Sequence, residues 1–259
     1  AFEAAIGQLA AQGVRIRSTQ VSGRSSPQFN ARLIAAALGD EHVKSDERVV
    51  LVGYSKGAVD ALQFLVDYPD LRSQVVAVVS VAGAIGGSPL AERGDWWYRT
   101  FLEDAFEGMC APGDGQVVHS LRPSIRAAWL ESNPLPPEVR YYSLAGFPTA
   151  EHLSRGLAVT WRMLAEHDRR NDGQVLAGDS IIPGSTVLGY VNADHWDLAL
   201  DLHRQLPHLS ARPQARDLPR SELLQAALLF VSDDLGRNGA VTSGATRRDR
   251  KSTRLNSSH

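Results

Sequence analysis

Short apolar runs and stretches of helical periodicity follow one another along the chain. Residues 49–52 (VVLV) and 75–82 (VVAVVSVA) are continuous apolar runs, which are typical of strands buried on both faces of a parallel sheet. Residues 139–145 (VRYYSLA) and 185–191 (STVLGYV) predict two further strands. Residues 14–21 (VRIRSTQV) alternate in polarity, which predicts a fifth.

Apolar residues recur at helical spacing between these runs. The predicted helices begin near Phe2 and cover residues 28–38, 58–68, 149–167, 197–206 and 220–232. Pro69 ends the third of them, because proline cannot continue a helix. Strands that alternate with helices predict an α/β fold, with a mostly parallel sheet covered by helices on both faces.

One connection is too long for a loop and a single helix. About 56 residues separate the strand ending near Ala82 from the strand starting near Val139. They include the large side chains Trp96, Trp97, Tyr98, Phe101, Phe106, Met109 and Trp129. We expect residues 83–138 to form a lid or substrate-binding excursion, the alternative being a small satellite core.

Composition limits the remaining possibilities. A chain of 259 residues with 43% hydrophobic content can bury a full core, and residues 1–235 are predicted to form one domain. The net charge is −2, but the last 24 residues are basic, so residues 1–235 carry −7, which argues against nucleic-acid binding. Cys110, the only cysteine, cannot form an intrachain disulfide, and no run of about 18 apolar residues predicts a membrane span.

Residues 236–259 are polar and rich in Gly, Ser and Thr, which predicts a disordered tail. The last nine residues of this tail resemble translated adapter sequence. Compartment and oligomeric state are not predicted by the sequence.

The stretch Gly53-Tyr54-Ser55-Lys56-Gly57 lies between a predicted strand and a predicted helix, and it fits the G-x-S-x-G nucleophile elbow. Ser55 would be the nucleophile. We expect Gly53 and Gly57 to be glycine because a Cβ at either position would collide with the neighbouring strand or helix. The backbone N–H of Lys56 is expected to face an oxyanion at the helix N-terminus, and the side chain of Lys56 is expected to face solvent.

A serine nucleophile needs a base and an acid. His195 follows the strand ending at Val191, and the carboxyl ends of parallel strands meet at one edge of a sheet, so His195 is the predicted base. Asp172, in the turn sequence Asn-Asp-Gly, is the predicted acid. Competing carboxylates are Asp168, Asp179 and Asp194. The histidines predicted to lie on the surface are His152, His167, His203 and His208.

The segments LVGYSKGA, VRYYSLAG, NDGQV and VNADHWDL, spread over residues 48–200, together resemble the α/β-hydrolase superfamily, in particular bacterial lipases and esterases. The resemblance implies a serine carboxylic-ester hydrolase without a cofactor, acting on a small-molecule or lipid ester with an apolar acyl group. The alternatives are an acyltransferase or thioesterase, and a catalytically silent hydrolase-fold interaction protein.

The resemblance carries two structural expectations. It makes residues 14–21 the fourth strand of the hydrolase sheet and puts the third strand, with the second oxyanion donor, before Ala1. A chain without that strand is expected to be poorly soluble or to pair the flanking strands directly. Asp197 matches a calcium ligand of related lipases, but residue 201 is Asp where a glutamine is usual, so Asp197 is read first as a helix N-cap.

Overall fold

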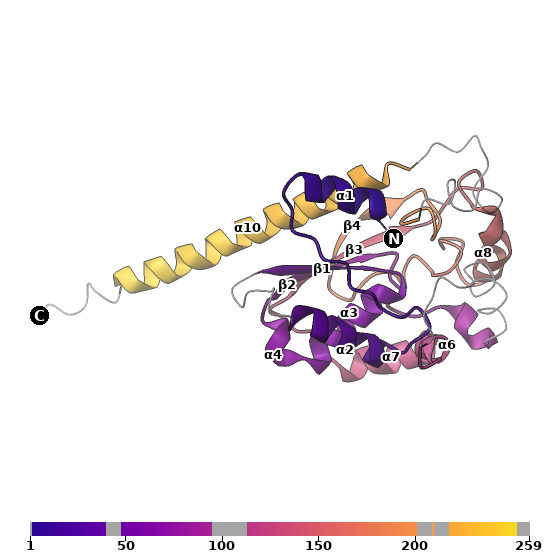
Figure 1. The fold of residues 1–259 in the computed structure, drawn as a ribbon, viewed down its shortest axis with the longest axis horizontal. Helices are drawn as coiled ribbons and strands as arrows, with labels where there is room; N and C mark the ends of the chain where they lie inside the picture. Colours follow the sequence, from indigo (N-terminus) through magenta and orange to yellow (C-terminus); the bar gives the residue numbers. More distant parts are fainter. Residues whose placement is uncertain (1, 40–47, 95–112, 201–208, 210–217, 253–259) are drawn as a thin grey trace, which may run out of the picture.

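Four parallel strands form the centre of the molecule (Figure 1). The structure is a computed structural model that describes residues 2–39, 48–94, 113–200, 209 and 218–252. The strands are β1 (Val49–Tyr54), β2 (Val75–Val81), β3 (Arg140–Gly146) and β4 (Thr186–Val191), adjacent in that order. The four strands predicted at these positions, and the α/β class, are therefore confirmed.

The register of the sheet brings the carboxyl ends of the strands together. Tyr54 at the end of β1 pairs with Val81 at the end of β2, and Val81 pairs with Leu144 of β3. On the far side of β3, Gly146 pairs with Val191, the last residue of β4. Loops that follow different strands therefore begin side by side at one edge, where ligands bind in parallel sheets.

Helices cover both faces of the sheet. On one face, α2 (Pro27–Leu38) and α3 (Lys56–Asp67) pack with Val78 of β2 in the largest cluster of buried residues. The short helix α4 (Pro69–Arg72) follows α3. On the other face, Val79 and Val81 share a cluster with Val231 of α10 (Arg220–Ser252), which lies beside α1 (Glu3–Ala11) (Figure 1). Because β2 sends alternate side chains into two cores, its sequence is apolar throughout.

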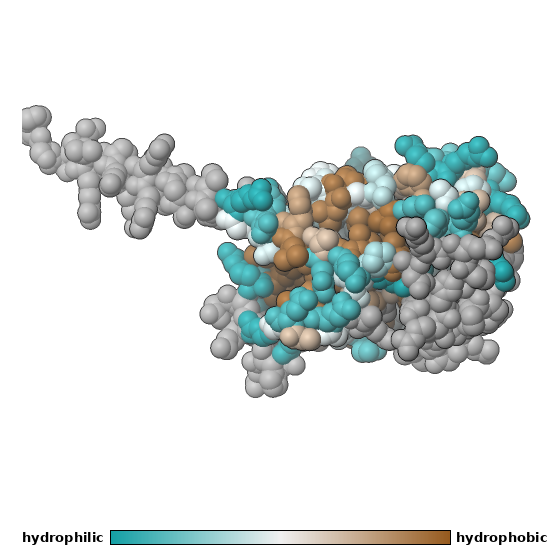
Figure 2. All heavy atoms as spheres, turned by 90° about the horizontal axis from the view of Figure 1, so that it is seen from above, coloured by the Kyte–Doolittle hydropathy of each residue, from teal (hydrophilic) through white to brown (hydrophobic). Residues whose placement is uncertain are grey.

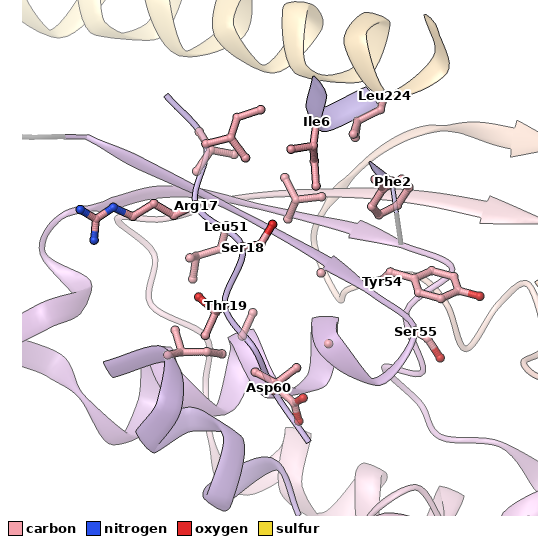
Figure 3. Close-up of a pocket in the computed structure, with 18 of the residues that line it drawn as sticks. Phe2, Ile6, Arg17, Ser18, Thr19, Leu51, Tyr54, Ser55, Asp60 and Leu224 are labelled. Carbon is pink, nitrogen blue, oxygen red and sulfur yellow. The ribbon is translucent and has the colours of Figure 1, made fainter. Parts of the chain in front are cut away.

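The predicted strand at residues 14–21 is wrong. These residues have no ladder partner among the described residues, and β1 is an edge strand there. A cavity of about 1410 Å³ lies between this segment, β1 and the helices α1 and α10, with Ser55 at one end of it (Figure 3). The expected direct pairing between the segment and β1 therefore does not occur, because the cavity separates the two backbones.

The predicted helix at residues 149–167 is shorter in the structure. Only η4 (Arg155–Leu157) and α8 (Ala158–Leu164) are helical. The turn before η4 is held by a residue distant in sequence, because the carboxylate of Asp194 accepts a hydrogen bond from the N–H of Ser154 at 2.5 Å. Residues 195–199 form turns rather than the start of a helix, and residues 201–206 lie outside the described residues.

The long excursion contains η1 (Pro89–Arg93), α6 (Val117–Ser120) and α7 (Pro123–Ser132). Residues 95–112 lie outside the described residues, together with Cys110 and most of the aromatic residues that suggested a lid. At the other end of the chain, α10 continues to Ser252, beyond the residue at which composition predicts disorder to begin. Gly and Ser do not interrupt the helical backbone there.

The surface is mixed in character. Figure 2 shows apolar side chains gathered in the middle of the face seen from above, bounded by polar residues. Exposed large apolar side chains include Val187 and Tyr190 of β4, and Leu229 and Phe230 of α10. Within the described residues, no helix has the length and apolar character that a membrane span requires.

Candidate active site

Ser55 stands in a sharp turn between β1 and α3. Its backbone has φ 53° and ψ −127°, a region that costs a residue with a side chain about 1–3 kcal/mol. Three backbone hydrogen bonds hold this conformation: the N–H of Ser55 donates to Val81 at 3.0 Å, and its carbonyl accepts from Ala58 and Ala84 at 3.2 Å each. The neighbouring strand β2 therefore helps to hold the turn.

The two glycines of the motif have different environments. A Cβ on Gly53 would lie 2.5 Å from the backbone N and Cα of Ala58, so the expected collision is confirmed at this position. A Cβ on Gly57 would meet nothing within 4 Å, so the same expectation is wrong there. The difference arises because the Cβ position of Gly53 faces the backbone of Ala58 in the first turn of α3, whereas the space at that of Gly57 is open.

These environments predict opposite effects of alanine. Gly53→Ala is expected to lower the free energy of unfolding by about 1–3 kcal/mol, because backbone atoms must move to admit the methyl group. Gly57→Ala is the matched control and should raise it by about 0.5–1 kcal/mol, since alanine favours the helix and has room. Urea unfolding of both variants measures the difference; equal effects at the two positions would contradict the steric assignment.

Ser55, His195 and Asp172 form a continuous chain of hydrogen bonds. The Oγ of Ser55 lies 2.8 Å from Nε2 of His195, and Nδ1 of His195 lies 2.7 Å from Oδ2 of Asp172. Asp172 is fully buried and His195 is 2% exposed. The three residues come from the loops after β1, after α8 and after β4. The structure thus brings together the three residues that were selected from the sequence.

Asp172 is held by its own turn. Its Oδ1 accepts backbone hydrogen bonds from Gln174 at 2.9 Å and Val175 at 2.7 Å, which leaves Oδ2 for His195. Its carbonyl also accepts from the backbone N–H of His195 at 2.8 Å. Gly173 has φ 92°, a value that few other residues tolerate, so the Asn-Asp-Gly sequence is required by the turn as well as by the carboxylate.

Tyr54 contacts His195 through its hydroxyl and its ring, and this contact was not identified from the sequence. Its hydroxyl donates a hydrogen bond to the carbonyl of His195 at 2.6 Å, and the two rings lie 5.1 Å apart. Burial raises the pKa of Tyr54 well above its usual value, and the charges of Asp172 and Asp194 raise it further. The phenol therefore stays a donor, and it fixes the backbone of the histidine loop.

The competing carboxylates have other partners. Asp194 bonds the backbone N–H groups of Ser154 and Asp197, and burial raises its pKa to about 6. Asp168 pairs with Arg170 on the surface. The carbonyl of Asp179 accepts a hydrogen bond from Gly86, and the carboxylate of Asp179 lies beside the same glycine. His152 is half-buried and His167 exposed, while residues 203 and 208 lie outside the described residues.

The expectation that the Lys56 side chain faces solvent is wrong. Lys56 is only 8% exposed, and its Nζ lies 2.5 Å from Oδ1 of Asp60, one helical turn later. Burial lowers the pKa of Lys56. The sequence contained a signal for this pair, since Asp60 interrupts the apolar residues of α3 at spacing i+4 from Lys56.

The cavity wall near Ser55 is mainly apolar. Val117, Val118 and Leu121, from α6 and the residue after it, line the cavity together with Val175 and Trp196. Part of the excursion between β2 and β3 thus borders the cavity beside Ser55. An apolar wall of this kind suits an apolar group on a ligand.

The residues around Asp197 do not fit a calcium site. Oδ1 of Asp197 lies 2.7 Å from the guanidinium of Arg220, which also donates to the carbonyl of Asp197. Nor does a helix follow Asp197 directly, since residues 198 and 199 form a turn, and the N–H of Asp197 donates to Oδ1 of Asp194. Across the part of the chain that the structure describes, no group of three or more His, Cys, Asp or Glu side chains could hold a metal ion.

Comparison with known proteins agrees with this architecture. No family model and no curated protein sequence matches the chain. Among solved structures, the metagenomic carboxyl esterase MGS0156 is 37% identical, with a TM-score of 0.78 over 90% of this chain and 70% of that one. The Staphylococcus hyicus lipase is 13% identical, with a TM-score of 0.63 over 92% and 89% of the two chains.

The mature Bacillus licheniformis lipase BlEst2 is 23% identical, with a TM-score of 0.58 over 74% of this chain and 77% of that one. The two lipases show a shared fold, and the identity to the carboxyl esterase shows the family. The chain therefore belongs to the α/β-hydrolase superfamily, among its carboxylic-ester hydrolases of the esterase and lipase type.

Proposed function

We propose that the chain is a serine esterase that hydrolyses carboxylic esters through an acyl-enzyme on Ser55. One observation carries the proposal: an unbroken hydrogen-bonded chain runs from the Oγ of Ser55 through both ring nitrogens of His195 to the buried carboxylate of Asp172. The strained backbone of Ser55 supports the same role, because it projects the hydroxyl from the elbow toward the cavity.

In the acylation step, Ser55 Oγ attacks the ester carbonyl carbon while Nε2 of His195 takes the hydroxyl proton. Asp172 keeps the proton of His195 on Nδ1 and stabilises the imidazolium that forms. The backbone N–H of Lys56, at the start of α3, donates to the oxyanion, and the helix dipole adds to the stabilisation. The imidazolium then gives its proton to the departing alkoxide as the ester bond breaks.

Deacylation repeats the step with water as the nucleophile. His195 removes a proton from water, the hydroxide adds to the acyl carbon, and the proton returns to Ser55 Oγ as the carboxylic acid leaves. The apolar wall at Val117, Val118 and Trp196 favours an apolar acyl group in both steps. The related carboxyl esterase, at 37% identity, supports ester hydrolysis rather than acyl transfer as the first proposal.

Labelling with a fluorophosphonate tests this proposal. The wild-type chain should form a covalent adduct at Ser55, located by peptide mass spectrometry, and should hydrolyse p-nitrophenyl butyrate. Ser55→Ala should do neither while keeping its circular dichroism spectrum. A folded wild-type chain that takes no label would refute the proposal that the chain is a serine esterase. Assays with competing alcohols would detect an acyltransferase through ester products.

A further inference from the structure

A buried polar network begins at the residue that follows the nucleophile. The ammonium of Lys56 bonds Oδ1 of Asp60, and Oδ2 of Asp60 accepts a hydrogen bond from Nδ2 of Asn30 at 2.8 Å. All three side chains are buried: Lys56 is 8% exposed, Asp60 1% and Asn30 fully covered. Buried charges are costly unless they are paired, so removing one partner alone is expected to destabilise the fold.

The network ends on a wall of the active-site cavity. Asn30 bonds both backbone groups of Ser22, accepting from its N–H at 3.0 Å and donating to its carbonyl at 2.9 Å. Ser22 and Gly23 line the same cavity as Ser55 and Lys56. One chain of contacts therefore joins the nucleophile helix α3, the helix α2 and the facing cavity wall.

The network spans the part of α3 that the proposed chemistry depends on. Lys56 is the first residue of α3, and the first N–H groups of a helix have no partner within the helix and are the most prone to fraying. The ion pair to Asp60 bridges that first turn. Without it, the N–H of Lys56 would be free to move relative to the Oγ of Ser55, and small displacements of a positioned group lower rates strongly.

We infer that Lys56 and Asp60 are positioning residues for the esterase reaction: with Asn30 they fix the first turn of α3 and the Ser22–Gly23 wall, so that the N–H of Lys56 meets the oxyanion. This inference rests on the proposed function. It gives the Lys56 side chain a role separate from that of its backbone N–H.

The pair also links activity to pH. Burial raises the pKa of Asp60 to about 6, although Lys56, Asn30 and Arg126 of α7 favour its ionised form. Asp114 lies close enough to Lys56 to stabilise the ammonium as well. The ion pair is therefore present above about pH 6 and is lost below it, as Asp60 takes up a proton. Protonation of Asp60 therefore contributes to the loss of rate on the acid side of the pH profile.

Three variants test the inference. Lys56→Met and Asp60→Asn remove one partner, and the double variant Lys56→Met/Asp60→Leu replaces the buried pair with apolar groups, a change that many folds tolerate. Asp67→Asn, an exposed carboxylate on the same helix, is the matched control. The measurements are the second-order rate of fluorophosphonate labelling of Ser55 between pH 5 and 8, kcat and KM for p-nitrophenyl butyrate, and the thermal midpoint.

We expect the double variant to fold with a thermal midpoint near that of the wild type, yet to be labelled about 10- to 100-fold more slowly at pH 8, with kcat lowered and KM nearly unchanged. Its rate should fall less steeply below pH 6 than that of the wild type, because Asp60 is no longer there to take up a proton. A folded double variant with wild-type labelling rates and the wild-type acid limb would overturn the inference. Failure of the proposed function differs, since the wild type itself would then take no label.

Discussion

Replacing His195 with glutamine is expected to lower kcat for p-nitrophenyl butyrate by about 10⁴- to 10⁶-fold. The reason lies in the proposed mechanism, in which Nε2 of His195, 2.8 Å from the Oγ of Ser55, takes the hydroxyl proton. Glutamine fills a similar volume and offers hydrogen bonds, but it cannot accept a proton near neutral pH. Steady-state kinetics at high enzyme concentration measures the residual rate.

His152→Gln is the matched control, since this half-buried histidine bonds Thr149 near Asn192 and touches none of the three catalytic candidates. It should keep wild-type kcat. Equal losses in the two variants would point to a general effect on folding and would contradict the role assigned to His195.

Asp172→Asn is expected to lower kcat by about 10³- to 10⁴-fold while leaving the fold intact. The amide can still accept the N–H groups of Gln174 and Val175 through its oxygen, so the turn is kept. Its NH₂ group, facing Nδ1 of His195, forces the proton of the ring onto Nε2. The imidazole is then unable to accept a proton from Ser55, which stopped-flow labelling would detect.

Two other carboxylates serve as comparisons. Asp168→Asn removes a surface partner of Arg170 and should leave kcat unchanged. Asp194→Asn changes a buried group beside His195 in sequence, but its two bonds go to backbone N–H groups of Ser154 and Asp197. If Asp194→Asn lost as much activity as Asp172→Asn at equal thermal stability, the assignment of the acid would be wrong.

The sequence predicted which three residues would come together at the candidate site, because each prediction followed from a physical constraint that is local or topological. Gly53 and Ser55 belong to a strand-turn-helix whose apolar pattern is unambiguous. His195 and Asp172 follow from the rule that parallel strands end at one edge, which does not depend on knowing the side chains between them. The structure brings these residues to the distances of hydrogen bonds.

Other features depended on partners distant in sequence. The alternation in residues 14–21 indicates which side chains share a face, but a strand also needs a neighbouring backbone, and within the described ranges these residues pair with none. Lysine is usually exposed, so the sequence predicts a surface position for Lys56. Its burial depends on Asp60 and on Asn30 of another helix. The hydroxyl contact from Tyr54 to His195 joins residues 141 positions apart, which no periodicity indicates.

The left-handed backbone of Ser55 has a consequence for laboratory evolution. The rest of the fold holds this residue, through Val81, Ala58 and Ala84, in a conformation that a glycine would adopt without strain. Thermal stability therefore favours glycine at position 55, whereas the proposed reaction requires serine. A screen that scored only survival at high temperature would favour loss of the Ser55 hydroxyl, on which the proposed reaction depends, so heat-resistant clones need to be sorted by activity as well.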